Sequence, residues 1–311
     1  MKNVNRTPPK TYLLMLSLVM ILGLSLGLTG CGQWESMGAE THISPEQVLS
    51  PVEGSPLDCE KFMTAKDVAR VLAPLPREYE EQAEIVVVPH HALAADMTAE
   101  ALLQAGAADK DLFIIIGPNH ANQGANIIVS DQAYEGGGHP LKNRLAWDDA
   151  TLEALTLEST LLDNLSFQNE HSVGMPASLI AQINPHGEIL PIICRRELTS
   201  EEGARLFSTL APLLDEDTLI IASVDFSHHL SVPDALGRNE QMAELIQAGK
   251  SAQVSRLDST YLDAPGVMAA LMEYAQSQQL TPTILRKATA ADYLGAGYDG
   301  EVTSYLTIQY R

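Results

Sequence analysis

One stretch, from Leu112 to Asn122, limits what this chain can fold into more than any other. It reads Leu-Phe-Ile-Ile-Ile-Gly-Pro-Asn-His-Ala-Asn, so a short apolar and largely β-branched run ends abruptly at Gly117 and Pro118. A run of this kind bounded by Gly-Pro predicts a buried strand. The polar residues that follow, including His120, would then lie at the carboxyl end of the strand, where open α/β sheets bind their ligands.

From Glu84 onward, apolar runs of strand length alternate with helical patterns. Strands are expected at Ile85–Val88, Leu112–Ile116, Ala125–Val129, Ile189–Cys194, Leu219–Val224, Pro282–Arg286 and Val302–Gln309. Helices are expected at Met97–Ala105, Asp148–Glu158, Met175–Gln182, Ser200–Leu214, Pro233–Ala248 and Pro265–Gln279. This alternation predicts a single α/β domain over residues 81–311, with a mainly parallel central sheet flanked by helices.

Residues 1–30 have the order of a secretory signal peptide. Basic residues near the start precede a mostly apolar run from Tyr12 to Leu28, and Leu28-Thr29-Gly30-Cys31 follows. This ending resembles the bacterial lipoprotein box, which implies that Cys31 becomes the lipidated N-terminus of a protein anchored on the non-cytoplasmic side of the cell envelope. A transmembrane anchor is the alternative, since about 17 apolar residues is the lower limit for a spanning helix. The position of Cys31 favours the lipoprotein.

Residues 31–80 are expected to be the lipidated cysteine and a tether, because Pro and Ser are frequent there and only one short helix is indicated, near Thr64 to Leu72. An exported compartment would permit a disulfide between Cys59 and Cys194. The position of Cys194 at the end of an apolar strand favours a buried free thiol instead. The formal charge of −21 argues against nucleic acid as a partner and against electrostatic attraction to anionic lipid.

Six of the nine histidines gather in four short segments, three of which follow predicted strands. The segments are Pro89-His90-His91, Gly117-Pro118-Asn119-His120, Glu170-His171-Ser172 and Asp225-Phe226-Ser227-His228-His229. Imidazole is the commonest protein ligand for metals, and two histidines with one carboxylate form the facial triad of non-haem iron sites. A single histidine at a strand end is more often a surface residue, so the grouping rather than any one segment carries the prediction.

His90 and His120 would supply the two nitrogens of such a site, and Asp225 or a later carboxylate the oxygen. Asp225 has the alternative of capping the turn after its strand. His171 and His228 would act as acid or base, or orient the ligands. Their neighbours His91 and His229 are expected to point elsewhere, because adjacent residues of an extended chain face opposite sides. His42, His139 and His186 are expected in the tether or in loops, with His139 beside the flexible run Gly136–Gly138.

These segments, in this order, resemble the Memo-like family, the B component of the AmmeMemoRadiSam set. The matching positions are Pro89–Leu93, Gly117–His120, Glu170–Ser172 and Ala222–His228, and the resemblance spans Ile85 to Tyr310. It implies a fold similar to the class III extradiol non-haem iron dioxygenases and a divalent metal ion (Fe, Zn or Cu). It also implies that His90 and His120 bind the metal, that His171, Asp225 and His228 line the pocket, and that radical-SAM system proteins are partners.

The chain departs from the family at positions near the expected pocket. Many members supply a third ligand from a cysteine before a late helix, whereas Asp263 stands at that place here. Asp263 is therefore either a carboxylate ligand, which gives a harder site than a thiolate, or a cap for the helix at Pro265. Ala92-Leu93 replaces a Gly-Tyr step, and Lys142 replaces a glycine.

The sequence supports three functions. The first is a metal-dependent oxidoreductase acting on a small molecule. The second is a non-catalytic lipoprotein that binds a metal or another ligand, and the third is a partner protein whose histidines only pack the core. Because fold does not fix function, the dioxygenase resemblance alone does not choose among them.

Overall fold

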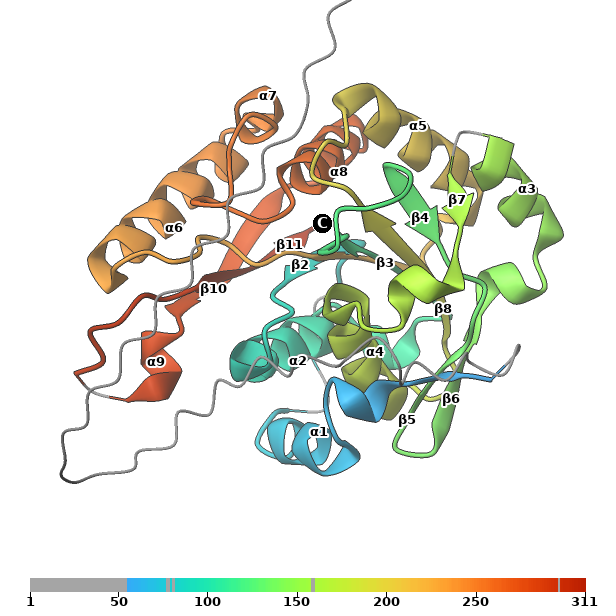
Figure 1. Ribbon diagram of the computed structural model, residues 1–311, viewed down its shortest axis with the longest axis horizontal. Helices are drawn as coiled ribbons and strands as arrows, with labels where there is room; N and C mark the ends of the chain where they lie inside the picture. The colour runs from blue at the N-terminus through green and yellow to red at the C-terminus, as the bar shows by residue number, and fades with distance from the viewer. Residues whose placement is uncertain (1–54, 77–78, 80–81, 158–159, 296) are drawn as a thin grey trace, which may run out of the picture. The chain divides into compact units, whose positions relative to one another are not determined.

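An eleven-stranded sheet crosses the described part of the chain, in the order β1-β5-β6-β8-β3-β9-β2-β11-β10, with β4 and β7 branching from β8 (Figure 1). The computed structural model describes residues 55–76, 79, 82–157, 160–295 and 297–311. The strands are β1 (Leu57–Asp58), β2 (Ile85–Val88), β3 (Leu112–Pro118), β4 (Ile127–Val129), β5 (Tyr134–Gly136), β6 (His139–Asn143), β7 (Leu161–Leu162), β8 (Glu188–Cys194), β9 (Thr218–Ser223), β10 (Pro282–Thr289) and β11 (Ser304–Tyr310).

The four central strands, β8, β3, β9 and β2, run parallel to one another. Pro118 of β3 pairs with Cys194 of β8, Ile116 pairs with Ala222 of β9, and Ser223 of β9 pairs with Val88 of β2. The carboxyl ends of these strands therefore form a row along one edge of the sheet. β11 continues the sheet beyond β2 as an antiparallel strand, and β10 pairs antiparallel with β11.

Helices cover both faces of the sheet, as the alternating sequence pattern predicts (Figure 1). They are α1 (Ala65–Leu72), α2 (Ala95–Gln104), α3 (Asp149–Leu157), α4 (His171–Ile183), α5 (Ser200–Leu210), α6 (Val232–Gln247), α7 (Ser251–Val254), α8 (Pro265–Ser277) and α9 (Ala291–Leu294). One hydrophobic core lies between the sheet and α5, α6 and α8, and a second lies between the sheet and α1, α2 and α4. The mainly parallel α/β architecture is confirmed.

One local expectation, the start of α4, was wrong. α4 begins at His171 rather than at Met175, because the Glu170 side chain accepts a hydrogen bond from Ser172 N and caps the helix earlier, with Pro176 inside it. The glycine run is the turn of the β5–β6 hairpin, where Gly137 and Gly138 have φ of +63° and +77°. Two-residue hairpin turns of type I′ require positive φ at both central positions, which glycine adopts without strain.

The α/β fold begins well before residue 81, so the second half of the expected tether is part of the domain. β1 pairs in parallel with β5, and Leu57, Cys59 and Val68 are buried in the core on the α1, α2 and α4 side. The apolar side chains of this segment are shielded from water because they pack on the sheet. The signal peptide and Cys31 lie outside the described residues. Within the described residues, no helix is long and apolar enough to cross a membrane.

Cys59 and Cys194 are free, buried thiols in the described structure. They belong to the two different hydrophobic cores, on opposite faces of the sheet. Burial raises the pKa of both thiols to about 12. Both side chains therefore act as small apolar core groups, because a thiol with such a pKa forms almost no thiolate at neutral pH.

Candidate metal centre

Three histidines meet at the carboxyl edge of the parallel strands. His90 follows β2, His120 follows β3 and His171 opens α4, and one nitrogen of each lies within 4.8 Å of the others. The imidazole of His120 stacks on that of His171 with ring centroids 4.1 Å apart, and the His90 ring is 5.1 Å from the first and 5.2 Å from the second. His90 is buried, whereas the other two are exposed at the surface of the site.

His90 is held on three sides. Its backbone N donates to Asp225 Oδ1 (3.0 Å), and its Nδ1 is hydrogen-bonded to Ser223 Oγ (3.2 Å), both from the end of β9. Because Nδ1 is engaged there, Nε2 faces the site, where it lies 3.1 Å from Asp263 Oδ2. A histidine fixed through one nitrogen presents the other in a defined direction, which is how metal-binding histidines are arranged.

His120 is held by Glu170, the residue that caps α4. Its backbone N donates to Glu170 Oε2 (2.9 Å), and its Nδ1 donates to Glu170 Oε1 (2.7 Å). Nε2 of His120 is thereby directed to the site, 4.0 Å from Asp263 Oδ2. The sequence gives no sign of this role of Glu170, because a helix that begins at Met175 leaves the residue in a loop.

Asp263 does not cap α8. The N-cap of that helix is Ala264, and no side chain caps it. Asp263 is placed instead by its backbone N, which donates to Asp225 O (3.1 Å), next to a β-bridge between Phe226 and Leu262. Neither carboxylate oxygen of Asp263 receives a properly oriented hydrogen bond from the described residues, although both are buried.

A buried carboxylate without hydrogen-bond donors is costly unless a cation or another partner neutralises it. His90 Nε2 lies 3.1 Å from Asp263 Oδ2, so in the metal-free chain a protonated His90 can neutralise this carboxylate. The donor set at this position is therefore two or three imidazole nitrogens and one carboxylate. Such a set fits a first-row divalent metal ion.

The electrostatics of the site follow from burial and from the short contacts. Burial alone would lower the pKa of His90, but Asp225 and Asp263 raise it to about 9. Burial would raise the pKa of Glu170, but its hydrogen bond and charge interaction with His120 lower it to about 2. Burial and the neighbouring His120 and His90 lower the pKa of His171 to about 4, so this imidazole is neutral at pH 7.

His228, which sequence analysis grouped with these residues, lies outside the three-histidine cluster. Its Nδ1 is buried without a hydrogen-bond partner among the described residues. His91 packs its ring 5.9 Å from that of Tyr305, and His229 is exposed beside Glu301 (3.4 Å). His139 is the first residue of β6 rather than a loop residue.

Lys142, which replaces a glycine of the family pattern, also lies far from the histidines. Lys142 pairs with Glu188 at the start of β8, at the amino edge of the sheet. The expectation that it borders the pocket was therefore wrong, since the seven residues of β8 extend over about 20 Å. His139 precedes Lys142 on the same strand and is equally remote from the site.

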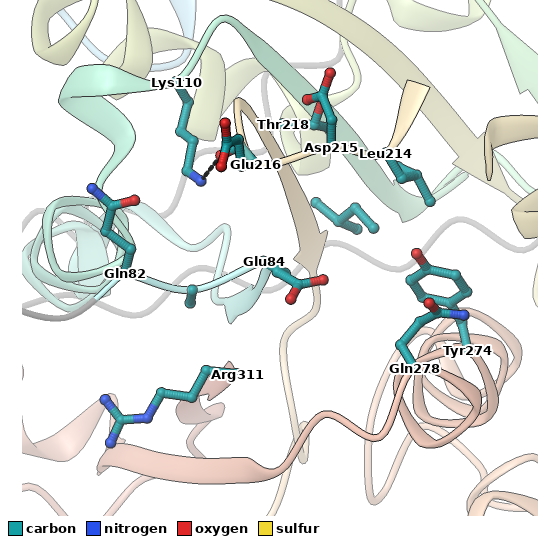
Figure 2. Close-up of a pocket in the computed structure, with 12 residues that line it drawn as sticks. Gln82, Glu84, Lys110, Leu214, Asp215, Glu216, Thr218, Tyr274, Gln278 and Arg311 are labelled. Atoms are coloured by element: carbon teal, nitrogen blue, oxygen red, sulfur yellow. Dashed lines mark hydrogen bonds between the residues drawn. The ribbon is translucent and has the colours of Figure 1, made fainter. Parts of the chain in front are cut away.

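A cavity of about 440 Å³ opens at this amino edge, at the opposite end of the strands from the histidines (Figure 2). Glu84, Lys110 and Tyr274 are among its lining residues, and Lys110 Nζ donates to the backbone oxygen of Glu216. Figure 2 shows side chains of both charges around the opening, with no histidine among them. The metal-ligating chemistry of the described chain is thus concentrated at the carboxyl edge, where ligands of parallel α/β sheets bind.

The fold and the site together define a class: a parallel α/β protein with a histidine cluster, able to hold a metal ion, at the carboxyl ends of its strands. Within that class the chain belongs to the Memo-like family, whose model, described as Memo-like protein, matches residues 61–303.

Its relatives include a MEMO1 family protein from Pyrobaculum aerophilum, 28% identical over 66% of this chain and 74% of that protein. A MEMO1 family protein from Caldivirga maquilingensis is 24% identical over 72% of this chain and 82% of that protein. A solved structure of an uncharacterized protein from Escherichia coli K12 covers 73% of this chain and 99% of that one, with 13% identity and a TM-score of 0.48. A likeness at that level says nothing about function.

Proposed function

We propose that this chain is a metal-dependent oxidoreductase of the cell envelope that acts on a small molecule. Nε2 of His90, Nε2 of His120 and the carboxylate of Asp263 would hold the divalent metal ion. The supporting observation is the orientation of the two rings. Nδ1 of His90 is hydrogen-bonded to Ser223, and Nδ1 of His120 to Glu170. Both Nε2 atoms therefore face Asp263 Oδ2, at 3.1 Å from His90 and 4.0 Å from His120. When bound, the ion would supply Lewis-acid or redox chemistry.

The remaining residues have roles that their contacts support. His171 is half exposed and neutral at pH 7, so it is suited to accept a proton from a substrate hydroxyl at its free nitrogen. Asp225 fixes the backbone of His90 and adds negative charge behind it. His228 follows Asp225 on the same loop and would line the pocket behind the metal ligands.

Metal content tests this proposal directly. Wild-type protein and the His90→Ala, His120→Ala and Asp263→Ala variants would be purified at full length and analysed by inductively coupled plasma mass spectrometry. His139→Ala is the matched control, because His139 is an exposed histidine at the other edge of the sheet. Close to one metal ion per chain is expected for wild type and control, with loss in both histidine variants. Equal metal in all the proteins would refute the site.

Turnover separates the enzyme from a binding protein. The metal-loaded chain would be incubated with a panel of catechols and other aromatic diols under oxygen, and oxygen consumption followed. Consumption that His171→Asn reduces without loss of metal would support the enzyme. Stoichiometric metal with no consumption across the panel would favour a metal-binding lipoprotein.

We also propose that a lipid chain on Cys31 anchors the protein to the membrane, on the non-cytoplasmic side. The support is the Leu28-Thr29-Gly30-Cys31 segment after a basic and apolar start. Metabolic labelling with a palmitate analogue should mark wild type but not Cys31→Ser. Membership of the Memo-like family supports radical-SAM proteins as partners, which affinity purification from the native membrane would test.

A further inference from the structure

The row of strand ends continues past the histidines to β8. Cys194, the last residue of β8, pairs with Pro118 of β3, and the hydrogen bond from Asn119 N to Cys194 O (2.8 Å) belongs to this last pair. Arg195 and Arg196 follow this pair on the side of β8, as Asn119 and His120 follow it on the side of β3. Neighbouring strands are separated by about 5 Å, so the two chains leave the sheet side by side at the edge that carries the histidines.

The segment that carries the two arginines connects both loops of the site. Arg196 N donates to Asn122 Oδ1 (3.1 Å), two residues after His120. At the other end of the segment, the backbone oxygen of Leu198 lies 2.6 Å from the position of a Cβ on Gly266, in the first turn of α8, just after Asp263. Arg196 is thus located between the loop of His120 and the loop of Asp263.

The two arginines differ in how their side chains are used. Arg195 Nη1 donates to Gly124 O (3.3 Å), and its Nη2 lies 3.2 Å from Glu197. The Arg196 side chain is exposed and makes no hydrogen bond or ion pair at contact distance with the part of the chain that the structure describes. Its charge acts at longer range: with the Thr260 hydrogen bonds and Arg238, it contributes to a lowered pKa of Asp258.

We propose that Arg196 binds the carboxylate of a small monoanionic substrate whose other end reaches the histidine site. This inference rests on the proposed function, because it assigns the substrate class of the same centre. A guanidinium matches a carboxylate with two parallel hydrogen bonds. In a chain of formal charge −21, an anion needs such a positioned cation to approach. The charges of Glu197 and Asp258 offset part of the field of Arg196, so the site should hold an anion of one charge better than a dianion such as a phosphate ester.

The test uses a ligand pair that differs only in charge. The full-length chain is loaded with Zn²⁺ and titrated by calorimetry with the monohydroxamate of succinic acid and with the primary amide of that compound. Both carry the same zinc-binding hydroxamate, but only the first has a carboxylate. We expect wild type to prefer the carboxylate by about 10- to 100-fold, the range for one charge-assisted hydrogen-bonded pair. Arg196→Gln should abolish this preference and leave zinc content and binding of the amide unchanged.

Arg70→Gln is the matched control, since Arg70 is an exposed arginine on α1 whose partner is Asp67, and it should retain the full preference. A second measurement needs no metal. Succinate should slow the modification of Arg196 by phenylglyoxal, followed by peptide mass spectrometry, whereas succinamide should not.

The outcomes separate the two proposals. If zinc is not retained but succinate protects Arg196, the metal centre is wrong and the anion site stands. If wild type shows neither the preference nor the protection, the anion site is wrong whatever the metal content. A preference that survives in Arg196→Gln also overturns it.

Discussion

Glu170 connects two parts of the site at the scale of a single side chain. Its Oε1 accepts from His120 Nδ1 and from Ser172 N, and its Oε2 accepts from His120 N. One carboxylate therefore caps α4 and fixes the direction in which His120 presents Nε2. Carboxylates behind metal-binding histidines set both the orientation and the basicity of the ring.

Glu170→Gln should weaken metal binding without removing any ligand. One oxygen is replaced by an amide nitrogen that cannot accept from His120, so we expect the affinity for Zn²⁺ to fall by about 10- to 100-fold. Competition with a chromogenic chelator measures this affinity. Glu60→Gln, a change on the exposed surface, is the control, and a circular dichroism melt checks that α4 remains folded. Wild-type affinity in Glu170→Gln would show that the contact only caps the helix.

Asp263 should control the charge of His90 in the metal-free protein. Asp225 and Asp263 raise the pKa of His90 to about 9 against the effect of burial. Asp263→Asn removes one of these two charges, so the pKa of His90 should fall, and an NMR titration of the imidazole proton would measure it. An unchanged His90 pKa would contradict the contact described here.

Asp263→Cys tests whether the side chain at position 263 binds the metal ion. A thiolate is a softer ligand than a carboxylate, so the variant should gain affinity for Cu(I) relative to wild type. The readout is competition with a Cu(I) chelator, and His139→Ala, remote from the site, should behave as wild type.

The residues of the site that follow strands could be predicted from the sequence, whereas the residue that caps a helix could not. His90 and His120 each follow an apolar run, and parallel strands bring their carboxyl ends to one edge whatever the details of packing. Glu170 acts through the first turn of α4, whereas the sequence predicts that this helix begins at Met175, because Pro176 favours the first helical turn. Arg196 lacks a local motif, and the role that we propose for it depends on β8 lying beside β3.

At the scale of elements, the contact between β3 and α4 sets the position of Glu170. A Cβ on Gly117 would lie 2.6 Å from Ser172 Oγ and 2.7 Å from Ser172 Cβ. Only a residue without a side chain lets the start of α4 pack this closely on the end of β3. The Ser172 hydroxyl uses the short approach to donate to Pro118 O (2.9 Å).

Gly117→Ala should therefore destabilise the fold and displace the start of α4. Inserting a methyl group in a packed contact costs about 1–3 kcal/mol, and urea denaturation would measure it. Gly237→Ala is the control, because Gly237 lies inside α6 with nothing within 4 Å of an added Cβ, and it should stabilise by about 0.5–1 kcal/mol. Equal urea midpoints for Gly117→Ala and Gly237→Ala would mean that the start of α4 moves without a loss of folding stability.

The strands and helices of the α/β unit follow from their patterns, whereas the elements at the margin of the sheet do not. β1, β5, β6 and β7 are short, and two of them have only two residues. Strands this short lack the alternation that identifies a strand in sequence, and they form because neighbouring backbone groups need partners. For the same reason the sequence predicts a tether over residues 31–80, with Pro56 and Pro74 among them, although residues 55–76 pack on the sheet.

At the scale of the whole molecule, the buried site couples stability to pH. His90 has a pKa of about 9 in the folded chain against 6.5 in the unfolded chain, so it stabilises fully below pH 6.5 and this contribution is lost as the pH rises through 9. Glu170 has a pKa of about 2 against 4.5, so its contribution is present above pH 4.5 and is lost as the pH falls towards 2. The pKa of His171 is about 4 in the folded chain against 6.5 in the unfolded chain, so protonation of this imidazole favours unfolding as the pH falls from 6.5 to 4.

The metal-free chain should consequently be most resistant to unfolding near pH 6.5, with an alkaline decline that belongs to His90. Guanidinium denaturation across this range would show it, and His90→Asn should flatten the alkaline limb while His139→Asn leaves it intact. Zinc should reverse the trend, because the ion must displace the proton that His90 carries below its pKa of about 9. The stabilisation by saturating Zn²⁺ should therefore grow between pH 6 and pH 8.5. A zinc effect that is independent of pH would mean that His90 does not bind the metal.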